Sequence, residues 1–408
     1  MPRSAGARVA DADGMALKRR GLPPLRLAIA AVIGAWALMF EIPRFIGLVR
    51  MDPAANDFRL FYVAAQVGLR WGWSHMYDPD RLHELSLAFG PADSAILTSY
   101  TYQNPPLLAW LVAPLTGLPL QAAFCVWAAI NIGALVAAWW LAAPGSSRFA
   151  RATVLICSAS VWPTVYSLER GQPVLITYGL AIGCWWMASR QREIQAGILL
   201  TLAWAFKPQD VALLPVVLVI CGHRRAAAWW LASTAALWGV FAFVIGPTGM
   251  GTFLGVLAWA ASDPSYTLNT VATLIGQGTP LLLAQAAFAA AALGGAWRQR
   301  RSWDVAFAIG LMGSVMSAVH LHDYDYVGLV VAAWLSLRQP ITKVELVWIA
   351  MGVVSAQVIS VGNRLPMVLW QPVWFAMLAI RKTSTVSRSG ASLEPAPPPE
   401  VDARMRQP

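Results

Sequence analysis

The sequence predicts an all-α polytopic membrane protein, and three observations indicate this fold class. Of its 408 residues, 58% are hydrophobic and 12% are charged, about half the charged fraction that is usual in soluble domains. The apolar residues form long runs, and short clusters of Arg and Lys separate these runs, as the positive-inside rule predicts. The 21 Trp residues suit a protein with two membrane interfaces, where amphipathic rings collect.

Composition also argues against several classes of protein and of binding site. The net charge is +10, but the positive residues lie between apolar runs and not in one basic patch, which argues against nucleic-acid binding. The four cysteines lie inside or at the ends of apolar segments without metal-ligand spacing, so we expect small buried hydrophobes and no disulfides. We expect no bound metal and no other cofactor. They are Cys125, Cys157, Cys184 and Cys221.

The apolar runs and basic clusters together predict the topology. The first run, about Leu27 to Val49, is longer than the apolar region of a signal peptide and is expected to be the first membrane helix. Placing every basic cluster in the cytoplasm predicts eleven further crossings, hence about 12 in all, with both termini inside. They lie near 121–143, 150–168, 172–189, 194–207, 208–222, 226–246, 279–297, 303–320, 326–338, 342–360 and 365–380. Residues 26–382 would form this membrane domain, and residues 1–25 and 383–408 would be disordered cytoplasmic tails.

Two segments do not fit a simple crossing. Pro105–Leu118 is apolar but short, and counting it as a crossing would invert all later clusters, so we expect a re-entrant or half helix. The largest external loop, residues 50–104, contains two stretches with helical apolar spacing, Asp57–Trp71 and Asp80–Phe89. They are expected to be helices that lie on the bilayer surface. A second external loop is expected from Gly246 to Asn269.

In this topology, polar side chains that are unusual in a membrane protein all fall on the external side. They are Asp57, Gln103, Asn104, Glu169, Arg170, Gln172, Lys207, Gln209, Asp210, His320, His322, Asp323 and Asp325. Ionisable groups at helix ends and inside bundles are costly and mark functional sites. The sequence therefore predicts an external catalytic or binding cavity, although each residue alone could merely reach its own interface.

Asp57 and Lys207 are the two residues of this set with the clearest chemistry. Asp57 could act as a general base on a hydroxyl group, or it could cap the helix that its apolar-periodic successors predict. Lys207 precedes Pro208, which breaks a helix and leaves an ammonium at the external interface. This ammonium could pair with a lipid phosphate, or the side chain could simply extend from a helix end.

The remaining candidates lie in two external turns. The spacing from His320 to Asp325 could indicate a metal site, but substrate hydrogen bonding, or interface residues with an Asp cap, explain it without further ligands. In the turn Glu169–Gln172, Gly171 permits the reversal, Gln172 can hydrogen-bond to a polyol, and the Glu169–Arg170 pair could be structural. Neither turn resembles a nucleotide-binding loop.

The order of these motifs resembles glycosyltransferase family 87, membrane enzymes of the GT-C class that use a sugar on polyprenyl phosphate. The resemblance rests on an ordered set of short motifs between about residues 27 and 340. They are Asn56-Asp57-Phe58 with Tyr62 and Ala64-Ala65, Met76-Tyr77-Asp78, Tyr102-Gln103-Asn104-Pro105-Pro106, Pro114-Leu115, Gly171-Gln172, Lys207-Pro208-Gln209 and the His320–Asp325 turn.

The resemblance implies a GT-C-like fold and an inverting transfer of a hexose, best guessed as mannose, from a polyprenyl-phosphate sugar. The acceptor would be a lipid or glycan, and the active site would face the extracytoplasmic side of the inner (plasma) membrane. Asp57 matches the family's catalytic aspartate, and Lys207 matches its Lys-Pro lysine, the candidate for the donor phosphate. Substrate-binding candidates are Gln103, Asn104, Glu169, Gln172, Gln209, His320, His322 and Asp323. The family's Ser-Pro before the late turn is replaced here by Met316-Ser317-Ala318-Val319.

Two alternatives stay open at this point. A transporter or flippase of a polar lipid or lipid-linked sugar would also need a polar cavity, but we find no internal repeat and no polar groups at mid-depth of the bilayer, where transporters bind. A lipid-linked glycan ligase would use the same external cavity with a pyrophosphate donor.

Overall fold

The computed structural model describes residues 25–51, 57–89, 101–145, 147–263 and 267–382. The tails expected at residues 1–25 and 383–408 lie outside these ranges except for Leu25, which begins α1, and Asn56 of the motif at the start of the first loop also lies outside them. Within the described ranges all regular elements are helices and none is a strand, as the composition predicts.

Five of the described helices are long and apolar enough to cross a membrane. They are α1 (Leu25–Met51), α5 (Leu120–Ala142), α11 (Arg224–Ser262), α13 (Thr279–Arg298) and α16 (Lys343–Val358), which continues into η7 (Ile359–Val361). Shorter helices fill the bundle between them. They are α6 (Arg148–Ser160), α7 (Trp162–Arg170), α8 (Val174–Ser189), α9 (Glu193–Phe206), α10 (Leu214–Ile220), α14 (Trp303–Ser317), α15 (Val327–Ser336) and α17 (Leu365–Ile380).

Helix lengths therefore confirm a helical membrane protein, while the number of 12 crossings stays a prediction. The expected crossing at 208–222 consists of η4 (Pro208–Val211) and the seven-residue α10. Seven residues rise only about 10 Å, which is a third of the hydrocarbon thickness of a bilayer. The expected crossing at 150–168 is divided at Val161 into α6 and α7, and Pro163 lies in the first turn of α7, where its missing N–H costs no hydrogen bond.

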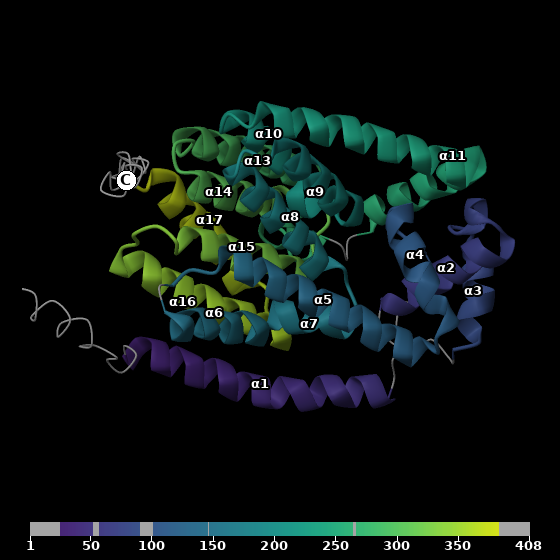
Figure 1. Ribbon diagram of the computed structural model, residues 1–408, viewed down its shortest axis with the longest axis horizontal. Helices are drawn as coiled ribbons and strands as arrows, with labels where there is room; N and C mark the ends of the chain where they lie inside the picture. Colours follow the sequence, from purple (N-terminus) through teal and green to yellow (C-terminus); the bar gives the residue numbers. More distant parts are fainter. Residues whose placement is uncertain (1–24, 52–56, 90–100, 146, 264–266, 383–408) are drawn as a thin grey trace, which may run out of the picture.

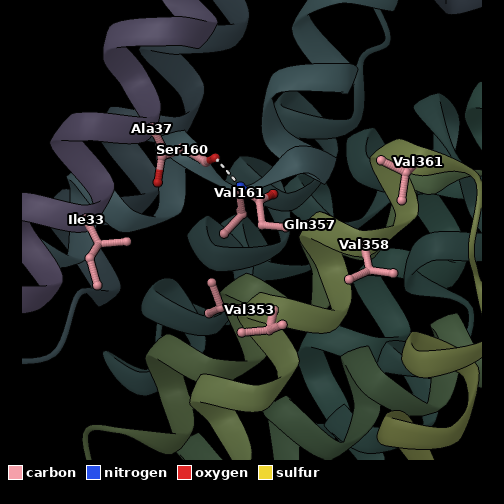
Figure 2. Close-up of a pocket in the computed structure, with 9 residues that line it drawn as sticks. Ile33, Ala37, Ser160, Val161, Val353, Gln357, Val358 and Val361 are labelled. Carbon is pink, nitrogen blue, oxygen red and sulfur yellow. Dashed lines mark hydrogen bonds between the residues drawn. The ribbon is translucent and has the colours of Figure 1, made fainter.

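The joint between α6 and α7 is held by one side chain of α16. The Gln357 amide accepts a hydrogen bond from the Trp162 backbone N–H and donates one to the Ser160 carbonyl. Around this joint lies an apolar groove of about 370 Å³, with Ile33 and Ala37 of α1 on one side and α16 on the other. Figure 2 shows the residues that line this groove, with Gln357 beside Ser160 and Val161.

The first loop, which the sequence predicts to be external, forms a helical unit at one end of the molecule (Figure 1). It contains α2 (Phe58–Trp71), η2 (Trp73–His75) and α3 (Pro79–Leu87), followed by α4 (Pro106–Val112) and η3 (Ala113–Gly117). We expected α2 to lie on the bilayer with one face in water, but most of it is buried, from Phe58 to Gly68. The short apolar segment after residue 105 is helical, and its re-entrant path stays a prediction.

The unit of the first loop has a hydrophobic core separate from that of the main bundle. Phe61, Tyr77 and Tyr102 belong to it, together with Phe124 of α5 and Phe253 of α11. The larger core lies among α8, α9, α14, α15 and α17. Most of the polar residues predicted from the sequence line the space between these two regions.

Helix α11 reaches both regions because it is bent. Gly246 has φ 66° and ψ 178°, values that a glycine adopts without strain and that no helix contains. This residue divides α11 into a first arm (224–245) and a second arm (247–262), and the ring centroids of Trp238 and Phe253, one on each arm, lie 6.1 Å apart. The second arm occupies the beginning of the expected external loop 246–269. The short α12 (Ala272–Ile275) follows.

Candidate active site

A cavity of about 1040 Å³ lies between the first-loop unit and the main bundle. Its walls come from the start of α2, the end of α7, the α9–η4 joint, the two arms of α11 and the turn before α15. Asp57, Gln172 and Lys207 all line it, although more than a hundred residues separate the first two along the chain. This cavity is where the sequence-predicted polar residues converge.

Asp57 precedes α2 without capping it. Its backbone is helical (φ −67°, ψ −22°), and its side chain makes no cap hydrogen bond. Instead, one carboxylate oxygen accepts a hydrogen bond of 2.7 Å from the Gln172 amide. The carboxylate therefore points into the cavity, away from the first turn of its helix.

The electrostatic surroundings of Asp57 suit a base. Burial raises the pKa of its carboxyl group above the ordinary value of 3.8, while Arg170, the hydrogen bond from Gln172 and Lys207 lower it in turn. A carboxylate with a raised pKa accepts a proton more readily than one with the ordinary value.

Gly171 fixes the turn that brings Gln172 to Asp57. Its φ of 67° lies in the left-handed region, and a Cβ atom there would meet Phe58 at 2.6 Å. The Gly171 carbonyl also accepts a hydrogen bond of 2.7 Å from the Trp127 indole. Any other residue would therefore strain the backbone and push α2 away from α7.

Lys207 is anchored by a buried ion pair. It ends α9, because Pro208 follows it, and its side chain is 5% exposed. The ammonium contacts the Asp325 carboxylate and lies 4.4 Å from the centroid of the Tyr324 ring. Asp325 is fully buried and also accepts a hydrogen bond of 2.8 Å from the His322 backbone N–H. The lysine is thus held at the cavity wall and cannot extend freely into an interface.

A second carboxylate lies close to this ion pair. Asp210 is completely buried, and its oxygens make no hydrogen bond of ordinary geometry among the described residues. Burial and the neighbouring Asp325 raise the pKa of the Asp210 carboxyl group above its ordinary value, while Lys207 lowers it.

The two histidines of the late turn both line the cavity. Their ring centroids lie 4.7 Å apart, and the His322 ring lies 5.0 Å from that of Tyr324. Burial and the neighbouring Lys207 lower the pKa of His320 to about 3, and burial together with His320 lowers the pKa of His322 as well. Both rings are therefore neutral at physiological pH and can accept or donate one hydrogen bond each. Within the described ranges, no group of three His, Cys, Asp or Glu residues is arranged to hold a metal ion.

Of the other substrate-binding candidates predicted from the sequence, three line the cavity and two do not. Gln103, Asn104 and Gln209 contribute to its wall. Glu169 is turned to α1, where it forms an ion pair of 3.0 Å with Arg44. Asp323 lies behind the cavity wall, with Arg364 at 3.7 Å and the Trp162 indole at 3.5 Å.

Arg170 is the principal cavity residue that the site prediction omitted. It lines the cavity, and its guanidinium donates a hydrogen bond of 2.9 Å to the Tyr166 hydroxyl, one turn earlier in α7. Successive residues on a helix point about 100° apart, so Glu169 and Arg170 contact different neighbours. The spacing of Tyr166 and Arg170, four residues apart on one helix face, was the available signal.

The fold and the cavity define a helical membrane protein with a large cavity, in which a carboxylate and a fixed ammonium line the same space. The model of glycosyltransferase family 87 matches residues 100–321, which is more than half of the chain. The protein therefore belongs to glycosyltransferase family 87 and is a glycosyltransferase, as the motif order implies. No curated protein and no solved structure matches the chain. Because the matched segment begins after Asp57, the role of this residue rests on the geometry of the cavity.

Proposed function

We propose that this glycosyltransferase moves a hexose, with mannose as the first candidate, from a polyprenyl-phosphate sugar to a lipid or glycan acceptor. The active site faces the extracytoplasmic side of the inner membrane, and the reaction inverts the anomeric carbon. One observation carries the proposal: Asp57 and Lys207 line one cavity, each held in place by its own buried partner, Gln172 and Asp325 respectively.

Each step of the reaction has a residue to support it. The Asp57 carboxylate takes the proton of the acceptor hydroxyl as that oxygen forms its bond to the anomeric carbon. The bond from this carbon to the phosphate oxygen breaks, and its electron pair stays on the leaving polyprenyl phosphate. The ammonium of Lys207 stabilises this negative charge, a role for which a fixed cation needs no reorganisation.

The polar cavity residues complete the site. Gln172 holds the orientation of Asp57, and Gln103, Asn104 and Gln209 supply amide groups that hydrogen-bond to sugar hydroxyls. The neutral imidazoles of His320 and His322 add donors and acceptors next to Lys207 without adding charge. Glu169 and Asp323, which we expected to bind substrate, instead support the walls through Arg44 and Arg364.

The test compares three purified proteins in detergent: wild type, Asp57→Asn and Asp78→Asn. Transfer of radiolabelled sugar is measured from polyprenyl-phosphate mannose to a membrane-lipid or glycan acceptor pool. We expect Asp57→Asn to lose about 10²-fold or more of the rate, the scale of general-base catalysis. Asp78→Asn is the matched control, because Asp78 also precedes a helix of the first loop but does not line the cavity.

The outcomes separate the parts of the proposal. Equal rates for wild type and Asp57→Asn would remove Asp57 from the chemistry. No transfer by wild type from mannose, glucose or arabinose donors on polyprenyl phosphate would overturn the donor class.

A further inference from the structure

A column of three aromatic rings leads from helix α1 to the cavity. Trp162 and Tyr166 lie one turn apart on α7, with ring centroids 4.9 Å apart and an angle of 18° between the ring planes. The Tyr166 ring stacks in turn on Tyr324, in the turn before α15, with centroids 5.8 Å apart and an angle of 26°. Both contacts lie in the range in which aromatic rings attract one another. These three side chains are called the aromatic column below.

Each ring of the column has a cation over its face, at a distance at which cation–π attraction acts. The pairs, with the distance from the cation to the ring centroid, are Arg44 and Trp162 at 4.9 Å, Arg170 and Tyr166 at 5.0 Å, and Lys207 and Tyr324 at 4.4 Å. The cations come from three separate segments, namely α1, α7 and the end of α9. The column therefore connects a membrane helix on the outside of the bundle to two cations that line the cavity.

The column is held in place along its length. Trp162, Tyr166 and Arg170 follow one another at intervals of four residues, so they lie on one face of α7. The Arg170 guanidinium donates a hydrogen bond of 2.9 Å to the Tyr166 hydroxyl. At the outer end, Arg44 is fixed by its ion pair of 3.0 Å with Glu169. The rings therefore have a defined position before any substrate binds.

A ring and a carboxylate hold the ammonium of Lys207 in different ways. A lysine side chain is a flexible stem that ends in a point charge, so it needs contacts on more than one side to be fixed. Asp325 supplies one contact, but its negative charge also offsets the positive charge that a phosphate would meet. The Tyr324 ring attracts the ammonium through its quadrupole and carries no net charge. The ring thus helps to fix Lys207 without weakening its attraction for an anion.

We propose that Tyr324 is a positioning residue for Lys207, and that Trp162 and Tyr166 hold the Tyr324 ring in the orientation that this role requires. The inference rests on the proposed function, in which Lys207 stabilises the leaving phosphate. Tyr324 acts through the position of the ammonium, so its contribution belongs to the transition state. The competing interpretation is that the Tyr324 hydroxyl itself contacts the sugar, since Tyr324 also lines the cavity.

The first experiment separates the ring of Tyr324 from its hydroxyl. Sugar transfer is measured for wild type, Tyr324→Leu and Tyr324→Phe. We expect Tyr324→Leu to lower kcat by about tenfold or more, the effect of losing a desolvated cation–π contact, with little change in KM. Tyr324→Phe keeps the ring and should restore most of this kcat. An equal loss in both variants would assign the role to the hydroxyl, and an undiminished kcat in Tyr324→Leu would remove Tyr324 from the reaction; either result overturns the proposal.

A second measurement does not depend on transfer and uses thermal unfolding in detergent. Wild type, Tyr324→Leu, Lys207→Met and the double variant form a cycle. Because the ring and the ammonium are in contact, the midpoint shift of the double variant should be smaller than the two single shifts added together. Tyr77→Leu replaces Tyr324→Leu in the matched control cycle, because Tyr77 is fully buried and packs on other rings but does not line the cavity. The shifts of the control cycle should add, and additive shifts in the Tyr324 cycle would overturn the contact.

The outer ring of the column provides a third measurement. Trp162 does not line the cavity, and it reaches Lys207 only through Tyr166 and Tyr324. Trp162→Leu should therefore lower kcat less than Tyr324→Leu does, and it should cause no further loss in a Tyr324→Leu background. A further loss in the double variant would overturn the role assigned to the outer part of the column.

The positioning role and the proposed function fail in different ways. If the unfolding midpoints show coupling between Tyr324 and Lys207 but wild type transfers no sugar from polyprenyl phosphate, the donor class is wrong and the contact stands. If wild type transfers sugar but Tyr324→Leu is fully active and the midpoints are additive, the proposed function stands and the positioning role is wrong.

Discussion

Asp57 and Asp78 make the most informative comparison in this protein. Each directly precedes a helix of the first loop, α2 and α3 respectively. Asp78 has an extended backbone (φ −69°, ψ 113°), and its carboxylate accepts hydrogen bonds from the backbone N–H groups of Asp80 and Arg81. Asp57 has a helical backbone, makes no cap bond and contacts Gln172 from a distant part of the chain.

The difference lies in the backbone of the aspartate itself. An extended N-cap residue directs its side chain at the exposed N–H groups of the first turn. A helical backbone at the same position turns the carboxylate away from those groups and leaves it available to the cavity. Two residues with the same position relative to a helix thus have different surroundings, since one caps a helix and the other lines the cavity.

The strongest test of the different roles of Asp57 and Asp78 replaces each aspartate with serine, which caps helices well but cannot act as a base. Asp57→Ser should lower the rate of sugar transfer by about 10²- to 10⁴-fold while leaving the unfolding temperature in detergent unchanged. Asp78→Ser should retain both activity and stability. A fully active Asp57→Ser variant would show that Asp57 does not act as a base.

Arg81, which pairs with Asp78, and Lys207, which lines the cavity with Asp57, differ in how deeply they are buried. This difference predicts different effects on stability. Arg81 is paired with Asp78 at 3.3 Å, and its side chain is 32% exposed, whereas Lys207 and its partner Asp325 are buried. Lys207→Met should lower the free energy of unfolding by about 3–5 kcal/mol, because Asp325 keeps a buried charge without its cation. Arg81→Met should cost less than about 1 kcal/mol.

The double variant Lys207→Met/Asp325→Leu provides the control, because it removes both charges together. It should regain most of the lost stability but no transfer activity. Equal unfolding midpoints for Lys207→Met and wild type would contradict a buried ion pair.

A smaller effect is expected on the pH dependence of transfer. Asp57 must be ionised to accept a proton, so kcat/KM falls as the pH drops through its pKa, which burial places above 3.8. Arg170 lowers this pKa, so Arg170→Gln should raise it further and move the acid limb of the pH profile to higher pH. Arg364→Gln is the control, because this guanidinium faces Asp323. If kcat/KM falls at the same acid pH in wild type and in both variants, the pKa of Asp57 does not determine this fall.

Much of the cavity could be predicted from the sequence because topology places helix ends together. The clusters of Arg and Lys predict one side of the membrane for the turns with Gln172, Lys207 and His320. These three residues line one cavity. The motif order then implied the family that the comparison of residues 100–321 confirms.

The orientation of individual side chains could not be predicted in this way. Glu169 and Arg170 are neighbours, and which of them faces the cavity depends on how α7 is rotated against α1 and α2. In the same manner, Asp323 and Asp325 contact Arg364 and Lys207 in opposite directions from one short turn, η6 (Asp323–Tyr326). Such rotations are set by packing between helices that are distant in sequence.

The apolar pattern also could not predict where helices are interrupted. Hydropathy treats residues 150–168 and 208–222 as uninterrupted runs, since Val161 and the residues after Lys207 are mostly apolar. The structure interrupts both runs, and a polar side chain such as Gln357 satisfies the backbone groups that the break exposes.

The shared core of the first loop and the second arm of α11 has a consequence for biosynthesis. Phe58 and Tyr77 leave the ribosome long before Phe253, their partner in that core. At about 5–20 residues per second, the delay between Tyr77 and Phe253 is roughly 10 to 35 s. During this interval the aromatic side chains of the first loop lack Phe253 as a packing partner, and the cavity that both segments line does not yet exist. The nascent chain therefore completes its cavity only after the second arm of α11 has been made.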